Sequence, residues 1–483
     1  LMKGLQLDAK ESGLNSVLVP GGHAAISATV TNSGRETITL HSIQLTIQGQ
    51  PLPGDQKIAR LKPGQAETIH ASITVPANSV YTKPNFHREN RETDAVYTIE
   101  NPASATLPLA PWPLTASAAY ALDGGEGIVT ATARDSKNSA VPLAIAPPFS
   151  ISVEPESRIV PSNAGTAIEL EVSALSNLPS VASGAITLDL PAGWRAQPPS
   201  QTIKFDRAGE QRQVKFQIFP KAQSEGRAQI RAVLTHNGKQ YSEGYTLVTR
   251  EDLESAYYYQ PAVQRVSVVD VKLPRALKIG YIPGSGDDIP AVLRQIGLDV
   301  TEISPQELAS GDLSRYGTII LGIRAYDTRD DVKQHNQRLL DYVSAGGTLV
   351  AQYNTDLANF NNGHFAPFSL EIGRERVSVE EQPVEILQPD DPIFNFPNRI
   401  TANDFAGWVQ ERGLYFAGKW DSHFEPLLSS HDPNEPPLPG GLLRARYGKG
   451  TYIYNAYAFF RQLPYGVPGA IRLYVNLLSA GHQ

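Results

Sequence analysis

Apolar and polar residues alternate in short runs through the first half of the chain. Up to about residue 250, β-branched and other apolar side chains occupy every second position of several runs, and turn residues separate the runs. An alternation of period two predicts strands with one buried face. The predicted strands cover residues 24–32, 43–47, 67–75, 128–133, 168–175 and 214–219. Antiparallel β-sandwiches are built from runs of this kind.

A proline-containing interruption at residues 144–148 divides this region. We therefore predict one β-sandwich over residues 1–146 and a second over residues 147–250. The clearest hairpin joins residues 228–235 to residues 240–248, because Asn237 and Gly238 suit the two positive-φ positions of a type I′ turn.

The charged and aromatic segment 81–100 has two readings. It is either a long solvated loop or a contact surface for another domain.

The pattern changes after Tyr257, Tyr258 and Tyr259. We interpret residues 251–274 as a linker with one strand, and residues 275–483 as an α/β domain with a large insertion. Continuous apolar strands are predicted at 276–282, 300–303, 318–323 and 348–353, helices at 287–297, 331–345 and 468–480, and a hairpin at 442–447 and 451–455. Such alternation predicts a mostly parallel sheet covered on both faces. The expected fold is multidomain: two antiparallel β-sandwiches followed by an α/β domain.

Composition narrows the classes of partner and chemistry. The 483 residues carry a net charge of -7, which argues against nucleic acid as a partner. The absence of Cys removes disulfides, thiolate catalysis and Cys-ligated metals. No run of 18 apolar residues occurs, so we predict no transmembrane segment. The chain opens at Leu1 without a basic and apolar leader, which indicates a fragment or a mature chain.

Two segments, residues 404–413 (DFAGWVQERG) and 459–469 (FFRQLPYGVPG), mix aromatic with long hydrogen-bonding side chains. Small-molecule pockets have this mixture. Further polar residues follow the strands 318–323 and 348–353, where ligands of α/β sheets bind. The candidate ligand-binding residues are Arg324, Asp327, Tyr353, Asn354, Asp404, Trp408, Glu411, Arg412, Trp420, Arg461 and Gln462.

Two structural alternatives stay open for these residues. Arg324 and Asp327 could simply pair and brace their loop. The whole set could be a buried polar network that fixes the insertion onto the sheet.

Other chemistry finds little support. The spacing in residues 284–288 (GSGDD) matches no nucleotide motif, and Asp287 or Asp288 is better read as a helix N-cap. Asp421, His423, His431 and Asp432 are the only local grouping with metal-ligand character, and we read it as a solvated loop. No Gly-x-Ser-x-Gly elbow occurs. We predict no catalytic residue and no metal in this chain.

Several motifs resemble the C-terminal accessory region of bacterial LmbE-like (PIG-L family) deacetylases. They are residues 280–287 (GYIPGSGD), 322–326 (GIRAY), 346–354 (GGTLVAQYN) and the Trp408 and Arg461 segments. The resemblance implies two sandwiches before a domain similar to class I glutamine amidotransferases and ThuA-like proteins, with flavodoxin-like layering. The second sandwich also resembles modules appended to alpha-galactosidases.

The sequence departs from these families at two points. It has no counterpart of the Pro-His-Pro-Asp-Asp zinc motif, so we expect zinc only in a catalytic domain outside this chain. It also has no Cys for an amidotransferase nucleophile elbow, which excludes a glutaminase reaction. We take the strand end at residues 352–354 as the corresponding region.

The main hypothesis is a non-catalytic carbohydrate-binding and scaffolding region of a zinc-dependent N-acetyl sugar deacetylase. A glycan or amino sugar would stack on Trp408 and Trp420, and the protein partner would be an N-terminal deacetylase domain or subunit. One alternative is a carbohydrate hydrolase that uses carboxylates such as Asp404 and Glu411. Another is a structural docking module, which predicts an apolar patch on the first sandwich and no cleft at Trp408. A periplasmic or secreted location is expected from the architecture, and a cytoplasmic one stays open.

Overall fold

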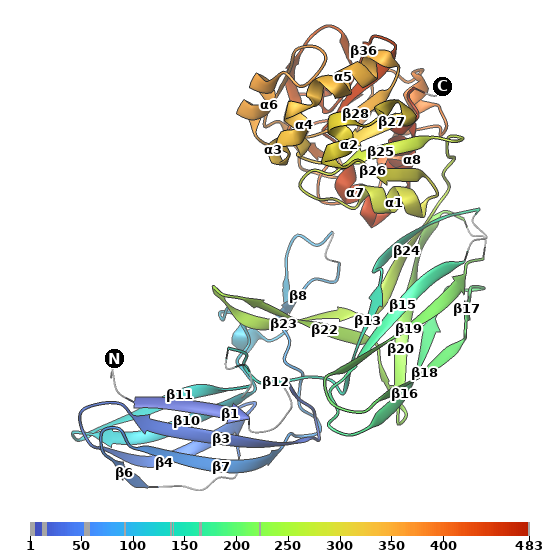
Figure 1. The fold of residues 1–483 in the computed structure, drawn as a ribbon. Coiled ribbons are helices and arrows are strands. Elements are labelled where there is room, and N and C mark those ends of the chain that lie inside the picture. Colours follow the sequence, from blue (N-terminus) through green and yellow to red (C-terminus); the bar gives the residue numbers. More distant parts are fainter. Residues whose placement is uncertain are drawn as a thin grey trace.

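The protein consists of two β-rich parts and a third part that also contains helices (Figure 1). The computed structural model describes residues 5–11, 17–52, 58–90, 93–135, 138, 140–163, 167–221 and 224–481. Over these residues the chain is mostly β.

The first part is sandwich-like, with an apolar core between its strands. Its strands are β1 (Leu5–Glu11), β2 (Val17–Leu18), β3 (His23–Asn32), β4 (Ile38–Ile47), β5 (Gln50–Pro51), β6 (Ala59–Leu61), β7 (Ala66–Thr74), β8 (Phe86–His87), β9 (Thr98–Ile99), β10 (Leu114–Leu122), β11 (Gly125–Arg134) and β12 (Ala144–Ile145). The main sheet runs β5-β4-β10-β11-β1-β3-β7. Its pairings are antiparallel except between β1 and β11, which meet in parallel. The alternation predicted the long strands, because every second side chain of β3 is buried.

The second part is a sandwich of two sheets, β13-β15-β19-β17 and β14-β24-β20-β16-β18. Its strands are β13 (Phe149–Glu154), β14 (Ser157–Pro161), β15 (Ile168–Ser176), β16 (Ala182–Asp189), β17 (Arg195–Gln197), β18 (Ser200–Phe205), β19 (Glu210–Phe219), β20 (Gly226–His236), β21 (Lys239–Tyr241) and β24 (Val263–Val269). Because β24 pairs with both β14 and β20, this part extends beyond the predicted limit at residue 250.

The predicted hairpin at Asn237 and Gly238 is present for only three residue pairs. Both residues have positive φ, 48° and 76°, and β21 pairs with β20 around them. The chain then leaves this sheet: β22 (Glu243–Arg250) pairs with β23 (Leu253–Pro261). Residues 251–274, which we interpreted as a linker with one strand, thus hold two strands, β23 and β24. Tyr257 and Tyr259 pack this second hairpin against Trp112 and Val17 of the first part.

The third part contains a seven-stranded sheet with the order β26-β25-β27-β28-β37-β36-β34. The strands are β25 (Lys278–Ile282), β26 (Asp299–Glu302), β27 (Thr318–Leu321), β28 (Thr348–Gln352), β34 (Phe424–Pro426), β36 (Leu442–Tyr447) and β37 (Gly450–Asn455). The pairings from β26 to β37 are parallel, and the last two are antiparallel. All side chains of β27, β28 and β37 are buried, as expected for strands covered on both faces.

Helices and a long insertion surround this sheet. The helices are α1 (Ile289–Gln295), α2 (Pro305–Ser310), α3 (Ala325–Thr328), α4 (Asp330–Gln334), α5 (Asn336–Ala345), α6 (Leu357–Gly363), α7 (Phe459–Tyr465) and α8 (Pro468–Leu478). Helix α7 contacts both α1 and α8, whereas α4 contacts α2 and α5 in a separate group (Figure 1). The insertion holds three two-stranded ladders, β29 (Leu370–Ile372) with β33 (Ala417–Trp420), β30 (Arg376–Val377) with β32 (Gly413–Leu414), and β31 (Glu385–Ile386) with β35 (Leu428–Ser429).

The single helix predicted at residues 331–345 is two helices, α4 and α5, which meet at His335. The side chain of Asn336 at the start of α5 is buried and accepts a hydrogen bond from the Tyr326 hydroxyl at 2.7 Å. It also donates to the Phe365 carbonyl at 3.1 Å. These bonds fix the break between α4 and α5. The spacing of apolar residues within 331–345 does not predict them, because their partners lie outside that segment.

The three parts meet at the end of α7. The Arg227 guanidinium of the second part lies 4.0 Å from the centre of the Tyr465 ring. Asn90, in segment 81–100 of the first part, donates to the Tyr465 hydroxyl at 3.3 Å. Segment 81–100 thus includes a contact with another part of the chain, the second of the two readings offered for it.

No described helix combines the length and apolar character that crossing a bilayer requires.

Candidate functional site

The turn between β27 and α3 presents Arg324 at the carboxyl edge of the parallel strands. Arg324 has left-handed backbone angles, φ 59° and ψ 28°, directly before the helix. Strands β25 and β27 are adjacent and parallel. The strand that follows β25 in sequence, β26, lies on one side of this pair, and the strand that follows β27, β28, lies on the other. Open α/β sheets bind ligands at such a switch point. We call residues 322–324 the elbow.

The loop after β25 holds the elbow in place. Ser285 N donates to the Ile323 carbonyl at 2.9 Å. The carboxylate of Asp287 accepts hydrogen bonds from the Tyr281 hydroxyl at 2.6 Å, from Ile289 N at 3.0 Å and from Ile323 N at 3.3 Å. Asp288 occupies the N-cap position of α1 without a side-chain bond, while Asp287, one residue earlier, bonds the first amide of the helix and also supports the residue before Arg324.

We expect Asp287 to give the protein a measurable pH dependence. Burial raises the pKa of this carboxyl above its ordinary value of 3.8, and the hydrogen bonds from Tyr281, Ile289 and Ile323 only partly oppose the shift. A raised pKa in the folded state means that the folded protein holds the proton more tightly than the unfolded chain, so stability falls as pH rises through the range above 3.8. Asp287→Asn removes this titration. Urea unfolding of both proteins at several pH values should show wild type losing stability relative to the variant as pH rises; a constant difference would contradict the assignment.

Asp327 braces the loop after β28. Its Oδ2 accepts from Thr355 N at 2.7 Å and from the Thr355 hydroxyl at 2.9 Å. The Nε of Arg324 lies 3.5 Å from the same oxygen. The alternative that Arg324 and Asp327 only brace their loop therefore fits Asp327. It fits Arg324 less well, because 41% of the Arg324 side chain is exposed. Asn354 is also structural, because it is buried and bonds Tyr326 N and the Gln352 carbonyl.

Three aromatic rings meet beside Arg324. The ring of Tyr353 stacks on Tyr415, with centroids 6.0 Å apart and planes 7° apart, and lies 5.4 Å from Phe460. Arg324 N donates to the Tyr353 carbonyl at 2.9 Å, which joins these rings to the elbow. Burial raises the pKa of the Tyr353 hydroxyl to about 12, so it remains protonated at neutral pH.

Arg461 and Glu411 complete this group. The Nε of Arg461 donates to Glu411 Oε1 at 2.9 Å, its Nη1 bonds Gln410, and its guanidinium lies 4.9 Å from the Phe460 ring centre. Arg461 is 35% exposed and Glu411 is 14% exposed. We name Arg324, Tyr353, Glu411, Tyr415, Phe460 and Arg461 the carboxyl-edge cluster.

Four other candidates form a buried network instead. Trp408 is 4% exposed, and its Nε1 donates to the Asp404 carbonyl at 3.2 Å. Gln462 is fully buried and bonds both the amide and the carbonyl of Val409. This arrangement corrects the expectation that Trp408 is a sugar platform, because its indole has no open face.

Arg412 belongs to the same network. Its guanidinium donates to the carbonyls of Gln382 and Phe405 and lies 5.4 Å from the Trp408 ring centre. Burial lowers the pKa of Arg412 to about 10. The buried-network alternative therefore describes Asp404, Trp408, Arg412 and Gln462.

Asp404 is engaged in an ion pair with Arg472 at 2.7 Å. Glu411 is paired with Arg461. The two carboxylates proposed for a hydrolase thus both form ion pairs with arginines. Trp420 lies in β33 opposite Leu370, and its ring makes no aromatic contact with the carboxyl-edge cluster within the described part of the chain.

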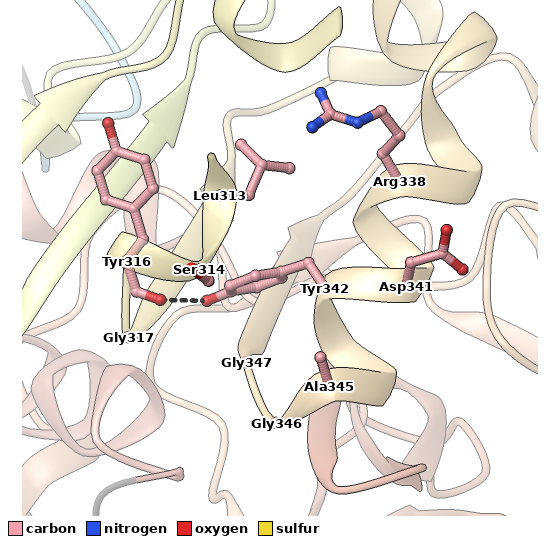
Figure 2. A pocket seen from close by; sticks show the side chains of 10 residues that line it. All are labelled: Leu313, Ser314, Tyr316, Gly317, Arg338, Asp341, Tyr342, Ala345, Gly346 and Gly347. Carbon is pink, nitrogen blue, oxygen red and sulfur yellow. Dashed lines mark hydrogen bonds between the residues drawn. The ribbon is translucent and has the colours of Figure 1, made fainter. Parts of the chain in front are cut away.

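A pocket lies at the opposite edge of the sheet, before β27 and β28 (Figure 2). It has a volume of about 490 Å³ and is lined by Tyr316, Arg338, Tyr342 and neighbouring residues. The Arg338 guanidinium is already bonded to the carbonyls of Leu308 and Gly311, and the Tyr342 hydroxyl to that of Tyr316. Because its polar groups hold the fold together, we do not assign this pocket a ligand.

The acidic and histidine grouping in residues 421–432 does not converge. His423 Nδ1 contacts Asp421 at 2.6 Å, whereas Asp432 accepts from the amides of Ser378 and Val379. No three His, Asp or Glu residues gather as metal ligands in the ranges that the structure describes.

Two members of the carboxyl-edge cluster, Tyr415 and Phe460, were not among the candidates from the sequence, and neither was Gln410, which bonds Arg461. Tyr415 and Gln410 have positive φ, 59° and 68°, as does Arg324. Strained non-glycine residues cluster at functional sites, but a sequence does not show them. Phe460 lies in the segment 459–469 that the sequence analysis singled out, but it was not named as a ligand-binding candidate. The correspondence of residues 352–354 to an amidotransferase elbow stays a prediction.

Comparisons with known proteins concern mainly the first part. The CARDB family matches residues 6–98, which form most of the sandwich-like first part. No curated protein matches the chain.

Solved structures give only distant similarities. The apo-form Calx CBD1 domain has 14% identity and a TM-score of 0.17, covering 26% of this chain and 98% of that one. A beta-galactosidase from Rahnella sp. R3 has 17% identity and a TM-score of 0.26, covering 42% and 31%. The exo-beta-1,4-mannosidase Op5Man5 from Opitutaceae bacterium strain TAV5 has 13% identity and a TM-score of 0.27, covering 43% and 36%. At such scores these similarities carry no argument about function.

Proposed function

We propose that the third part binds a glycan or amino sugar at the carboxyl-edge cluster, as a non-catalytic binding and scaffolding region. The observation that supports this proposal is the meeting of half-buried rings, Tyr415 and Phe460, with the exposed hydrogen-bonding groups of Arg324 and Arg461. Sugars present apolar faces to aromatic rings and hydroxyls to charged groups.

The proposal extends to the protein's context. The motif resemblance supports a position beside a zinc-dependent N-acetyl sugar deacetylase domain, which would carry the catalysis and the zinc. The fold that goes with it is an amidotransferase-like, flavodoxin-like third part. A periplasmic or secreted location is part of the same proposal and rests on the sandwich-rich architecture.

Titration calorimetry of the full chain with N-acetylglucosamine, glucosamine and chitooligosaccharides tests the sugar site. Arg461→Ala removes a charged hydrogen-bond donor, and such bonds contribute about 1.5–3 kcal/mol, so affinity should fall by about tenfold or more. Arg446→Ala is the matched control, because Arg446 is exposed on β36 and outside the cluster. Equal affinities of wild type and Arg461→Ala would move the sugar site elsewhere.

A second candidate is a docking module, and two observations favour it. Trp408 has no cleft, and the first part exposes apolar side chains at Val80 (72%), Val96 (77%), Tyr97 (55%) and Ile99 (42%). An adjoining deacetylase domain would cover these residues. No sugar binding by a folded chain in the same titration would favour this function over the first.

A further inference from the structure

The side chain at the elbow is a cation. In enzymes with a sharp strand-to-helix elbow, the strained residue at its centre carries the nucleophile and projects it over the sheet edge. Here that residue is Arg324, with φ 59°. A guanidinium has five N–H donors and no acceptor, and it stays protonated in proteins. The side chain at this elbow can therefore bind a hydrogen-bond acceptor or an anion, but it cannot act as a nucleophile.

Arg324 is poorly satisfied by its own surroundings. Its Nε is buried without a hydrogen-bond partner. The nearest carboxylate oxygen, Oδ2 of Asp327, is 3.5 Å away and already accepts two bonds from Thr355. A buried donor without a partner costs about 1–3 kcal/mol. The exposed part of the same side chain, 41% of its surface, is open to a ligand that accepts hydrogen bonds.

The charged groups around Arg324 favour a ligand with one negative charge over a ligand with two. Arg461 supplies a second exposed guanidinium, and the rings of Tyr353 and Phe460 lie between it and the elbow. Asp327 and Glu411 are negative and close, so a dianion such as phosphate would be repelled more than a carboxylate. The planar fork of arginine also matches the two oxygens of a carboxylate.

We propose that Arg324 anchors the carboxylate of an acidic sugar, such as a uronic acid, at the carboxyl-edge cluster. The sugar part of this inference rests on the proposed function above. The carboxylate part stands on the elbow geometry and on the exposed guanidinium of Arg324, whose Nε has no hydrogen-bond partner.

The test is a calorimetric titration of the full chain with five probes: D-glucuronate, its methyl ester, N-acetylglucosamine, succinate and inorganic phosphate. Glucuronate should bind at least about tenfold more tightly than its uncharged ester, which is the factor that 1.4 kcal/mol provides. Arg324→Gln keeps a non-glycine residue at the strained position and should abolish this preference. Arg324→Lys keeps the charge without the fork and should restore only part of it. Arg446→Gln is the control, and thermal unfolding establishes that each variant is folded.

The outcomes separate the carboxylate anchor from the sugar site. Binding of glucuronate and succinate but not N-acetylglucosamine, lost in Arg324→Gln, supports the anchor and contradicts the neutral-sugar function. Equal binding of glucuronate, its ester and N-acetylglucosamine overturns the anchor and leaves the proposed function standing. Tighter binding of phosphate than of either carboxylate, or no binding of any probe, also overturns it.

Discussion

Replacing Asp404 with Ala should lower the free energy of unfolding of the third part by about 3–5 kcal/mol, the usual effect of removing one partner of a buried ion pair. The Asp404 side chain is 6% exposed and pairs with Arg472 at 2.7 Å. Its other oxygen accepts from the amide and hydroxyl of Thr401 at 2.8 and 3.0 Å, which caps a short 3₁₀ helix. Without Asp404, Arg472 keeps its bonds to Glu225 and to the Asp270 carbonyl.

Urea unfolding followed by tryptophan fluorescence measures this loss, because the Trp408 indole bonds the Asp404 carbonyl and reports on this region. Glu371→Ala is the matched control: Glu371 pairs with Lys419, but the two side chains are 49% and 80% exposed. Surface pairs of this kind contribute about 0–1 kcal/mol. Equal losses in the two variants would show that Asp404 is not the anchor of the insertion.

Arg472 also forms a second ion pair, with Glu225, which crosses from the third part to the second. Glu225 precedes β20 of the second part, and Arg472 lies on α8 of the third. Together with Arg227 and Tyr465, it fixes the second sandwich to the helices α7 and α8. Helix α7 also carries Phe460 and Arg461, so the domain contact and the carboxyl-edge cluster share one short helix.

The alternation of apolar residues predicted the long strands because each has one buried face. It did not predict where each strand would pair. The residues after Gly238 have the alternation expected of the second strand of a hairpin, yet β22 pairs with β23 and not with β20. The reason is that Tyr245, Tyr257 and Tyr259 form an aromatic cluster that only the folded chain assembles. The break at His335 has the same origin, since the bonds of Asn336 come from residues distant in sequence.

The strand-end rule predicted that Arg324 and Tyr353 lie close together, and Arg324 N bonds the Tyr353 carbonyl. Arg324 and Tyr353 follow adjacent parallel strands, so their proximity followed from the sheet alone. The Trp408 segment could not be resolved this way, because buried networks and open pockets use the same mixture of aromatic and long polar residues. What decides between them is whether backbone carbonyls, such as those of Phe405 and Gln382, occupy the polar groups.

Replacing Gly284 with Ala should destabilise the third part by about 3 kcal/mol, the upper range for overpacking a rigid site, and should abolish selective binding of acidic sugars. A Cβ at Gly284 would lie 2.0 Å from the Ile323 carbonyl oxygen and 2.9 Å from Ala325 N. Both atoms are backbone on either side of Arg324, so neither can turn away as a side chain would. The elbow must move, and Arg324 moves with it.

Gly418→Ala is the control for this substitution. Its Cβ would meet nothing closer than Glu375 Oε1 at 3.6 Å, an ordinary contact, and its φ is not positive. Urea unfolding and titration with D-glucuronate should leave Gly418→Ala close to wild type and show both losses in Gly284→Ala. If Gly284→Ala instead loses stability but keeps its preference for glucuronate over the methyl ester, then the close packing of the loop after β25 supports the fold without positioning Arg324, and the cation at the elbow does not depend on that loop.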